Sequence, residues 1–156
     1  MKPRTELDVS SEDHQKAFTE TSFLLEILTK TIGNVVGRSA PSLGVNAGRQ
    51  MAKRMPIYLK DPELPEVLAA IANQMKAGFE IEYVCDETGA ELSINRCAIR
   101  EVCQNRGLAL GEQTCTMFHY YLAGIAAELH GCATRPGDAA VGEECKFRLT
   151  SGRRLR

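Results

Sequence analysis

Residues 111–149 read GEQTCTMFHYYLAGIAAELHGCATRPGDAAVGEECKFRL, and this stretch decides the fold. Apolar side chains recur at helical spacing from Cys115 to Leu129, which predicts one long helix over about residues 111–130 that ends at Gly131. Residues 135–138 (Arg-Pro-Gly-Asp) have the composition of a turn, and residues 139–141 and 145–149 have that of strands. The C-terminal half therefore consists of a helix and a strand that returns along it.

An antiparallel hairpin is predicted before this helix. Between Phe79 and Tyr83 apolar residues alternate with glutamates, residues 86–89 form a turn, and residues 91–95 supply the partner strand. Residues 98–106 then predict a short helix that Gly107 ends. Because the strand at 145–149 can pair with this hairpin, the sequence predicts an α+β fold with helices packed on one face of a small antiparallel sheet.

The chain up to Gly78 is predicted to be helical with one interruption. Acidic residues follow Ser10, which is an N-cap signal, and a helix of about 20 residues is expected to run to Gly33. Residues 34–46 contain two glycines and a proline, so we expect them to break any continuous helix. Shorter helices are predicted over residues 48–55 and from about residue 63 to Gly78.

Length and composition are typical of a single domain. In a chain of 156 residues we expect a flexible N-terminus over 1–12, one domain over 13–150 and a basic flexible tail over 151–156. The net charge of −1 gives no electrostatic case for direct nucleic-acid binding. No apolar run reaches the ~20 residues of a membrane span and residues 1–11 do not resemble a signal peptide, so a cytoplasmic protein is expected. The apolar stripe of the first helix has few obvious partners in so small a fold, which favours a homodimer.

The six cysteines all lie between residues 85 and 145, and in a reducing compartment they would remain thiols. Cys115 and Cys132 flank the long helix, so a rise of ~1.5 Å per residue separates them by roughly 25 Å and they cannot share one metal ion. The strand that begins at Cys145 returns toward the start of that helix, and Cys97 and Cys103 precede it closely. We therefore expect a four-thiolate site of Cys97, Cys103, Cys115 and Cys145 that holds zinc or an iron–sulfur cluster. The spacings do not decide between these metals, and the same thiols are also ordinary as small buried core residues.

Three sequence segments carry a family resemblance. They are Cys97 after a strand, residues 115–124 (CTMFHYYLAG) running on to Gly131, and residues 142–147 (GEECKF). Together they resemble the 4-vinyl-reductase-type domain, a hydrocarbon-binding module related in fold to TRAPP subunits and found in phenol-sensing transcription activators. In sensors of that type, zinc is held by a cysteine at the helix start, a Glu-x-x-Cys pair and a final cysteine. Only Cys115 and Cys145 match those ligands, because the region of residues 134–138 has neither Glu nor Cys.

The resemblance implies a sensor or accessory domain that binds a small, largely apolar molecule. Such pockets are mostly apolar, with a few polar groups that orient the ligand. The face of the long helix and the facing strand supply the candidate wall, namely Tyr83, Met117, Phe118, His119, Tyr121, Leu122 and Ile125. Without the resemblance, the same residues would be interpreted as ordinary core.

Two alternatives involve chemistry, and the sequence leaves the question of an enzyme open. An iron–sulfur redox protein follows from the cysteines alone. A hydrolase follows from Cys115 and His119, which lie four residues apart on one helix face and could act as nucleophile and base. The chain also bears a fainter likeness to thiazoline-carboxylate hydrolases. A reductase is not predicted, because the dinucleotide-binding fingerprint that would place a hydride donor is absent from the sequence.

Overall fold

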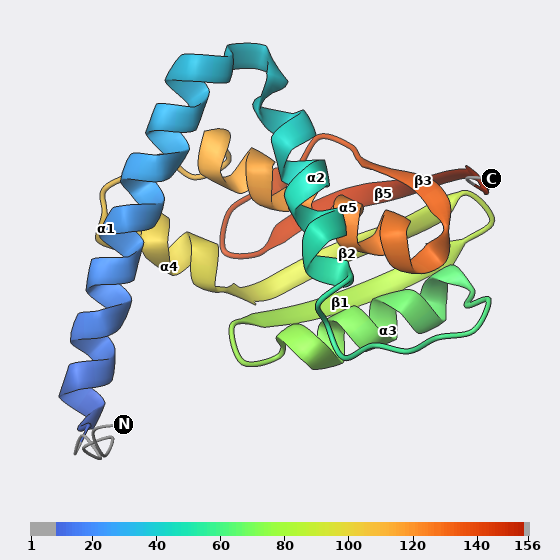
Figure 1. Cartoon of the computed structure of the whole chain (residues 1–156), viewed down its shortest axis with the longest axis horizontal. Helices are drawn as coiled ribbons and strands as arrows, with labels where there is room; N and C mark the ends of the chain where they lie inside the picture. The colour runs from blue at the N-terminus through green and yellow to red at the C-terminus, as the bar shows by residue number, and fades with distance from the viewer. Residues whose placement is uncertain (1–8, 155–156) are drawn as a thin grey trace, which may run out of the picture.

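The computed structural model describes residues 9–154, with side chains described for 9–152. Figure 1 shows an antiparallel sheet with helices against one of its faces and a long helix, α1, along one side. The sheet has five strands in the order β1-β2-β5-β3, and β4 pairs with β5. The strands are β1 (Phe79–Asp86), β2 (Gly89–Cys97), β3 (Cys132–Pro136), β4 (Ala140–Val141) and β5 (Cys145–Arg154). The predicted α+β class with a small antiparallel sheet is therefore confirmed.

Alternation along the strands separates a buried sheet face from an exposed one. On β2, Leu92 and Ile94 are buried, and in the antiparallel register they lie opposite Phe147 and Cys145 of β5. Helices α3 (Leu64–Met75) and α5 (Gln113–His130) cover this face and complete the core. The arrangement follows from period-2 patterning, because every second side chain of a strand points to the same face.

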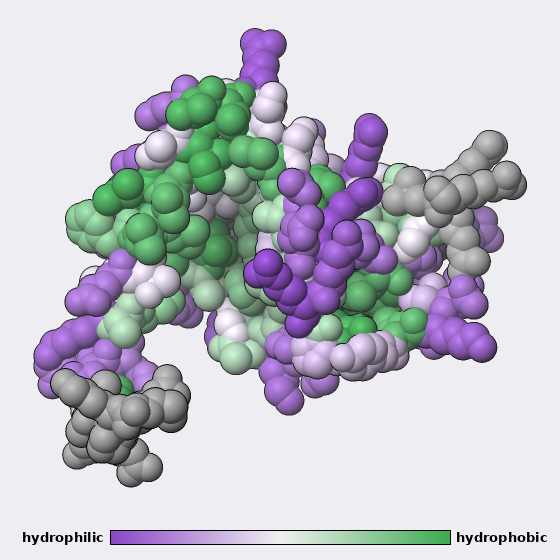
Figure 2. All heavy atoms as spheres, viewed as in Figure 1, coloured by the Kyte–Doolittle hydropathy of each residue, from purple (hydrophilic) through white to green (hydrophobic). Residues whose placement is uncertain are grey.

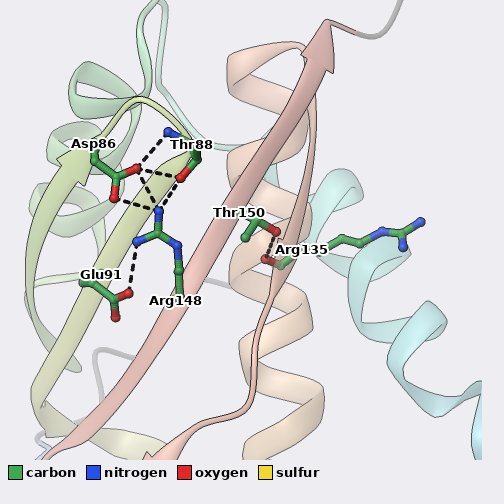
Figure 3. Close-up of polar contacts among 6 residues, drawn as sticks. All are labelled: Asp86, Thr88, Glu91, Arg135, Arg148 and Thr150. Carbon is green, nitrogen blue, oxygen red and sulfur yellow. Dashed lines mark hydrogen bonds and ion pairs between the residues drawn. The ribbon is translucent and has the colours of Figure 1, made fainter.

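The outer face of the sheet is polar and is tied together by Arg148 (Figure 3). Its guanidinium lies 2.7 Å from the Asp86 carboxylate, donates to Thr88 Oγ1 at 2.6 Å, and lies 3.0 Å from Glu91 Oε1. The hydrogen bond from Arg148, followed by those from Thr88, lowers the pKa of Asp86 to about 2. These contacts link the β1–β2 turn to the middle of β5.

The expected interruption at residues 34–46 is shorter than the sequence indicates. Helix α1 (Ser11–Val36) ends at Gly37, whose φ of 53° favours glycine, and the short 3-10 helix η1 (Gly37–Ser39) leads directly into α2 (Ala40–Ala52). Pro41 does not break α2, because it lies in the first turn, where its missing N–H is not needed. Gly44 is an interior residue of α2 and faces α5.

Glycines allow α2 and α5 to approach backbone to backbone. A Cβ on Gly48 would collide with the carbonyl oxygen of Tyr121, and a Cβ on Gly124 would collide with that of Val45. A side chain at either position would push the helices apart, because neither obstacle is a flexible side-chain end. Gly44, which argued against a helix in the sequence, also lies at this contact between α2 and α5.

Three polar contacts hold α1 to the rest of the molecule. Glu26 forms an ion pair with Arg106 of α4 (Ala98–Asn105) at 2.8 Å. The same guanidinium lies over the ring of Phe23, 3.7 Å from its centroid. About one turn further along α1, Gln113 Nε2 donates to the carbonyl oxygen of Thr29 at 2.9 Å. Helix α1 is therefore attached along one face only.

The C-terminal segment contains more strand than the sequence predicts. Residues 132–136 form β3 on the edge of the sheet, where we expected only a turn after the long helix. Strand β5 continues to Arg154, so residues 151–154 belong to the sheet and not to a tail. At the other end, residues 11 and 12 already belong to α1, while residues 1–8 and 155–156 of the predicted flexible ends lie outside the described residues.

Across the described range, no helix combines the length and apolar composition needed to cross a bilayer.

Candidate functional site

The four cysteines of the predicted site converge at one end of the molecule. Strand β2 ends at Cys97 and β5 begins at Cys145, and the antiparallel register brings these strand ends together. Cys103 lies on α4, which follows β2 directly, and Cys115 lies in the first turn of α5. All four are buried. The other two cysteines, Cys85 and Cys132, line a separate open cleft of about 860 Å³.

Three of these thiols surround a very small cavity, which we call the thiol chamber. Its volume is about 10 Å³, enough for about one water molecule. Its walls are formed by Ile94, Cys97, Ile99, Arg100, Leu110, Cys115, Phe118, His119, Val141 and Cys145. Cys103 lies behind this wall, where burial and then its interactions with Cys115 raise the pKa of its thiol to about 12.

The central polar contact of the thiol chamber joins Cys145 to His119. The Cys145 Sγ and the His119 Nε2 are 3.2 Å apart, and the imidazole packs on the ring of Phe147 with centroids 4.4 Å apart. Burial raises the pKa of Cys145 to about 11 and lowers that of His119 to about 4. Both groups are therefore neutral at pH 7. The partner of His119 is thus Cys145, and not Cys115 as the helix spacing suggested.

The four cysteines were predicted to hold zinc or an iron–sulfur cluster. Both metals bind thiolates, whereas burial raises the pKa of Cys97, Cys103 and Cys145. Among residues 9–154, no three His, Cys, Asp or Glu side chains are grouped in a way that could hold a metal ion. The arrangement in this structure does not fit either metal, and the four-thiolate site stays a prediction.

Arg100 supplies an unpaired positive charge in the wall of the thiol chamber. Its Nη1 donates to the carbonyl oxygen of Asn95 at 3.1 Å. Its Nε and Nη2 atoms are buried and have no hydrogen-bond partner among the described residues. A buried guanidinium with free N–H groups is costly unless an anion accepts them. Nothing in the sequence around Arg100 indicated that its side chain would place an unpaired charge in the wall of the thiol chamber.

A larger apolar pocket, which we call the interhelical pocket, lies next to the thiol chamber. It is open to solvent, has a volume of about 330 Å³ and is lined by α1, α2, α5 and the neighbouring ends of α3, β1 and α4. Its lining consists of Leu25, Thr29, Gly44, Ala47, Met75, Phe79, Ile99, Thr114, Met117, Phe118 and Tyr121. The rings of Phe79 and Phe118 stack with centroids 4.6 Å apart. Because Ile99 and Phe118 belong to both walls, these two side chains separate the two spaces.

The ligand-pocket residues expected from the sequence are divided between different surroundings. Met117, Phe118 and Tyr121 line the interhelical pocket. His119 faces the thiol chamber, Leu122 and Ile125 are buried in the core under the sheet, and Tyr83 packs at the edge of that core. Successive residues of a helix turn by about 100°, so one helix cannot present all of these side chains to one space.

The sequence did not predict that residues of α1 and α2 line the interhelical pocket. Leu25 and Thr29 come from α1, Gly44 comes from the part of α2 that the sequence placed in an interruption, and Ala47 follows that part directly. The spacing of Gly44 and Gly48, four residues apart, was the available signal, because small residues at this spacing lie on one face of a helix.

One solved structure shows the same fold at low sequence identity. The crystal structure of the phenol-responsive sensory domain of the transcription activator PoxR with phenol matches with a TM-score of 0.55 and 16% identity, over 84% of this chain and 74% of that one. No curated protein sequence matches the chain. The likeness supports the expected relation to a sensory-domain fold, but the 4-vinyl-reductase assignment itself is not confirmed.

A family model gives the more specific result. The model for L-2-amino-thiazoline-4-carboxylic acid hydrolase matches residues 14–149, which include the thiol chamber and the interhelical pocket. The match extends from the first turns of α1 to the middle of β5. The chain therefore belongs to the L-2-amino-thiazoline-4-carboxylic acid hydrolase family.

Proposed function

We propose that the chain binds a small, largely apolar molecule in the interhelical pocket. The observation that carries this proposal is the pocket itself, which at about 330 Å³ falls within the size range of small-molecule sites. Aromatic and aliphatic side chains form most of its wall, and Thr29, Thr114 and Tyr121 are its hydroxyl-bearing residues. A ring of phenol size fits such a lining, and the PoxR domain of the same fold was solved with phenol.

The experiment is a titration with monocyclic aromatic compounds, starting with phenol and benzoate, followed by calorimetry. Ala47→Phe fills the interhelical pocket from α2 and is expected to weaken binding at least tenfold. The matched control is Asn46→Phe, which adds the same ring at an exposed position of α2 that does not line the pocket. Absence of saturable binding to any of these compounds, or equal affinities for the two variants, would contradict the proposal.

The second candidate function is hydrolysis at Cys145 and His119. Two observations favour it, namely the 3.2 Å contact between Sγ and Nε2 and the hydrolase family to which the chain belongs. In the chemical step, the Cys145 thiol would give its proton to His119 Nε2 while sulfur attacks an electrophilic carbon of the substrate. The imidazolium would return that proton to the leaving group. Water would then cleave the sulfur–carbon bond and regenerate the thiol.

The protonation states of Cys145 and His119 favour ligand binding over hydrolysis as the function. Moving a proton from a thiol of pKa about 11 to an imidazole of pKa about 4 is uphill by on the order of 10 kcal/mol. The resting pair is therefore a neutral pair and not a thiolate–imidazolium. A substrate would also have to displace Phe118 or Ile99 to reach sulfur, because the thiol chamber holds about one water. Arg100 would then hold a carboxylate of that substrate.

Turnover of 2-aminothiazoline-4-carboxylate tests the hydrolase. Opening of the ring at its carbon–sulfur bond releases a free thiol that can be measured colorimetrically. Cys145→Ser and His119→Gln are expected to abolish the release, and Arg100→Met is expected to raise KM more than it lowers kcat. Cys85→Ser is the control, because Cys85 lies outside the thiol chamber. No release by the wild type, or full release by Cys145→Ser, would count against the assignment.

The role of the domain as a sensor or accessory module and the zinc or iron–sulfur site remain proposals. Metal analysis and an absorption spectrum of protein purified without oxygen test the second of these. Protein that holds less than one metal per chain would contradict the four-thiolate site. A stoichiometric metal lost in Cys97→Ser and Cys115→Ser would instead support the four-thiolate site.

A further inference from the structure

Helix α1 presents an apolar face that the other described residues of the chain leave uncovered. Leu24, Ile27 and Val35 are 57%, 51% and 79% exposed, and the neighbouring Phe23 and Leu28 are also exposed. Figure 2 shows hydrophobic residues gathered over the C-terminal half of α1 and its junction with α2. Apolar patches of this kind on a helix mark interaction surfaces, since isolated exposed apolar residues are common but contiguous ones are not.

The exposed face of α1 lies on the opposite side of the helix from the face that attaches it to the molecule. Steps of 100° along the helix place Ser22 and Thr29 toward the core side, where both are buried. The same steps place Glu20, Leu24, Ile27 and Thr31 on the opposite side, at spacings of four, three and four residues. This is the spacing of a seam between two helices that lie side by side.

We propose that this face pairs with α1 of a second copy of the chain in an antiparallel arrangement, giving a twofold symmetric dimer. Charge decides the direction. The outward face carries the acidic Glu20 toward the N-terminus, and Lys30, which is ion-paired with Glu26 of its own helix at 2.7 Å, lies on the flank of this face toward the C-terminus. A parallel pair would place Glu20 against Glu20 of the partner, whereas an antiparallel pair brings it to the Lys30 end of the partner helix.

The register follows from the position of the apolar residues. A twofold axis between residues 25 and 26 sets Leu24 opposite Ile27 of the partner subunit. Glu20 then falls opposite Thr31 of the partner subunit, next to its lysine. The pairing is isologous, so the same patch is covered on both copies. The inference does not depend on whether the interhelical pocket binds a ligand.

Light scattering after gel filtration tests the dimer. At about 100 µM, in the range where weak dimers form, the wild type is expected at twice the 17.1 kDa mass of the chain. Leu24→Glu combined with Ile27→Glu is expected to reduce the mass to that of the monomer, with its helical circular dichroism retained. The matched control is Val84→Glu, an exposed apolar position on the outer face of β1, which should stay dimeric.

Cross-linking tests the direction without relying on those variants. Glu20→Cys protein and Thr31→Cys protein are mixed and oxidised, and the antiparallel register predicts mixed disulfides between the two chains. Disulfides mainly between two Glu20→Cys chains would overturn the antiparallel arrangement. A wild type that is monomeric at this concentration, or a dimer that the Leu24 and Ile27 substitutions leave intact, would overturn the dimer itself.

Discussion

The buried imidazole of His119 makes the stability of the fold sensitive to acid. Its pKa is lowered from 6.5 to about 4 by burial. Between pH 4 and pH 6.5 the unfolded chain binds a proton at this residue and the folded chain does not. The stability that the neutral imidazole contributes to the folded state is therefore fully present above pH 6.5 and is lost as the pH falls through 4. The shift corresponds to about 3 kcal/mol of unfolding free energy.

Urea denaturation at pH 7 and pH 4.5 measures this loss. His119→Gln cannot titrate, so its unfolding free energy is expected to fall less than that of the wild type over the same interval. His14→Gln is the control, since His14 is exposed on α1 and the variant should behave like the wild type. A loss of the same size in His119→Gln would show that other groups cause the acid sensitivity.

The thiol of Cys145 is expected to react slowly with alkylating reagents at neutral pH. With a pKa of about 11 in place of 9.0, its thiolate fraction at pH 8 is about 100-fold lower than that of an unperturbed thiol. Alkylation of Cys145 by iodoacetamide, read by mass spectrometry, should therefore accelerate about tenfold for each pH unit between 8 and 10. The urea-unfolded chain is the reference. Rapid labelling of Cys145 at pH 7 in the folded protein would contradict this and would favour a catalytic thiolate.

Residue positions could be predicted from the sequence only where backbone geometry alone constrains them. The rise of an α-helix separates Cys115 from Cys132, and the return of β5 brings Cys145 back to the start of that helix, as the structure shows. The contact of Cys145 with His119 spans 26 residues and depends on how β5 packs against α5. No local pattern encodes such a contact, so the sequence suggested the nearer Cys115 instead.

At the scale of elements, the α2–α5 contact is the most sensitive packing in the molecule. Gly48→Ala places a methyl group against the carbonyl oxygen of Tyr121, and the backbones must separate to accept it. Overpacking of this kind costs about 1–3 kcal/mol or more, which exceeds the gain of about 1 kcal/mol in helix propensity. Thermal or urea unfolding should therefore show a net destabilisation.

Gly142→Ala is the matched control for this substitution. It makes the same chemical change at a position where nothing lies within 4 Å of the added carbon. Its unfolding free energy should stay within about 0.5 kcal/mol of the wild type. If Gly48→Ala were as stable as Gly142→Ala, the close approach of the two helices would not be needed for the fold.

Elements were predicted well where the hydrophobic period agrees with the positions of glycine and proline, and poorly where a glycine or proline has a purpose other than ending an element. The hairpin β1–β2 and the helix α5 have clear periods of 2 and 3.6, and both are present. Gly44 lies inside α2 for close packing, although glycine usually argues against a helix. Pro136 ends the edge strand β3, where its missing N–H is tolerated, although Pro-Gly-Asp usually indicates only a turn.

At the scale of the whole molecule, α1 connects the proposed dimer to the proposed ligand site. Its outward face carries Leu24 and Ile27, while Leu25 and Thr29 on the inward side line the interhelical pocket. A helix attached to its own chain along one face only is free to shift when the other face is exposed. Pairing with a second copy would hold that wall of the pocket in place, so dimerisation and ligand binding should be coupled.

Thermodynamic linkage makes this coupling measurable from both sides, because each event must shift the other by the same factor. Phenol is expected to bind more tightly at a protein concentration where the chain is dimeric than at one where it is monomeric. Conversely, saturating phenol should lower the dissociation constant of the dimer, as followed by sedimentation. The double variant Leu24→Glu and Ile27→Glu should bind phenol with the weaker affinity at every concentration, and Val84→Glu should behave like the wild type. Affinities that do not change with protein concentration would show that α1 forms the pocket wall without help from a partner.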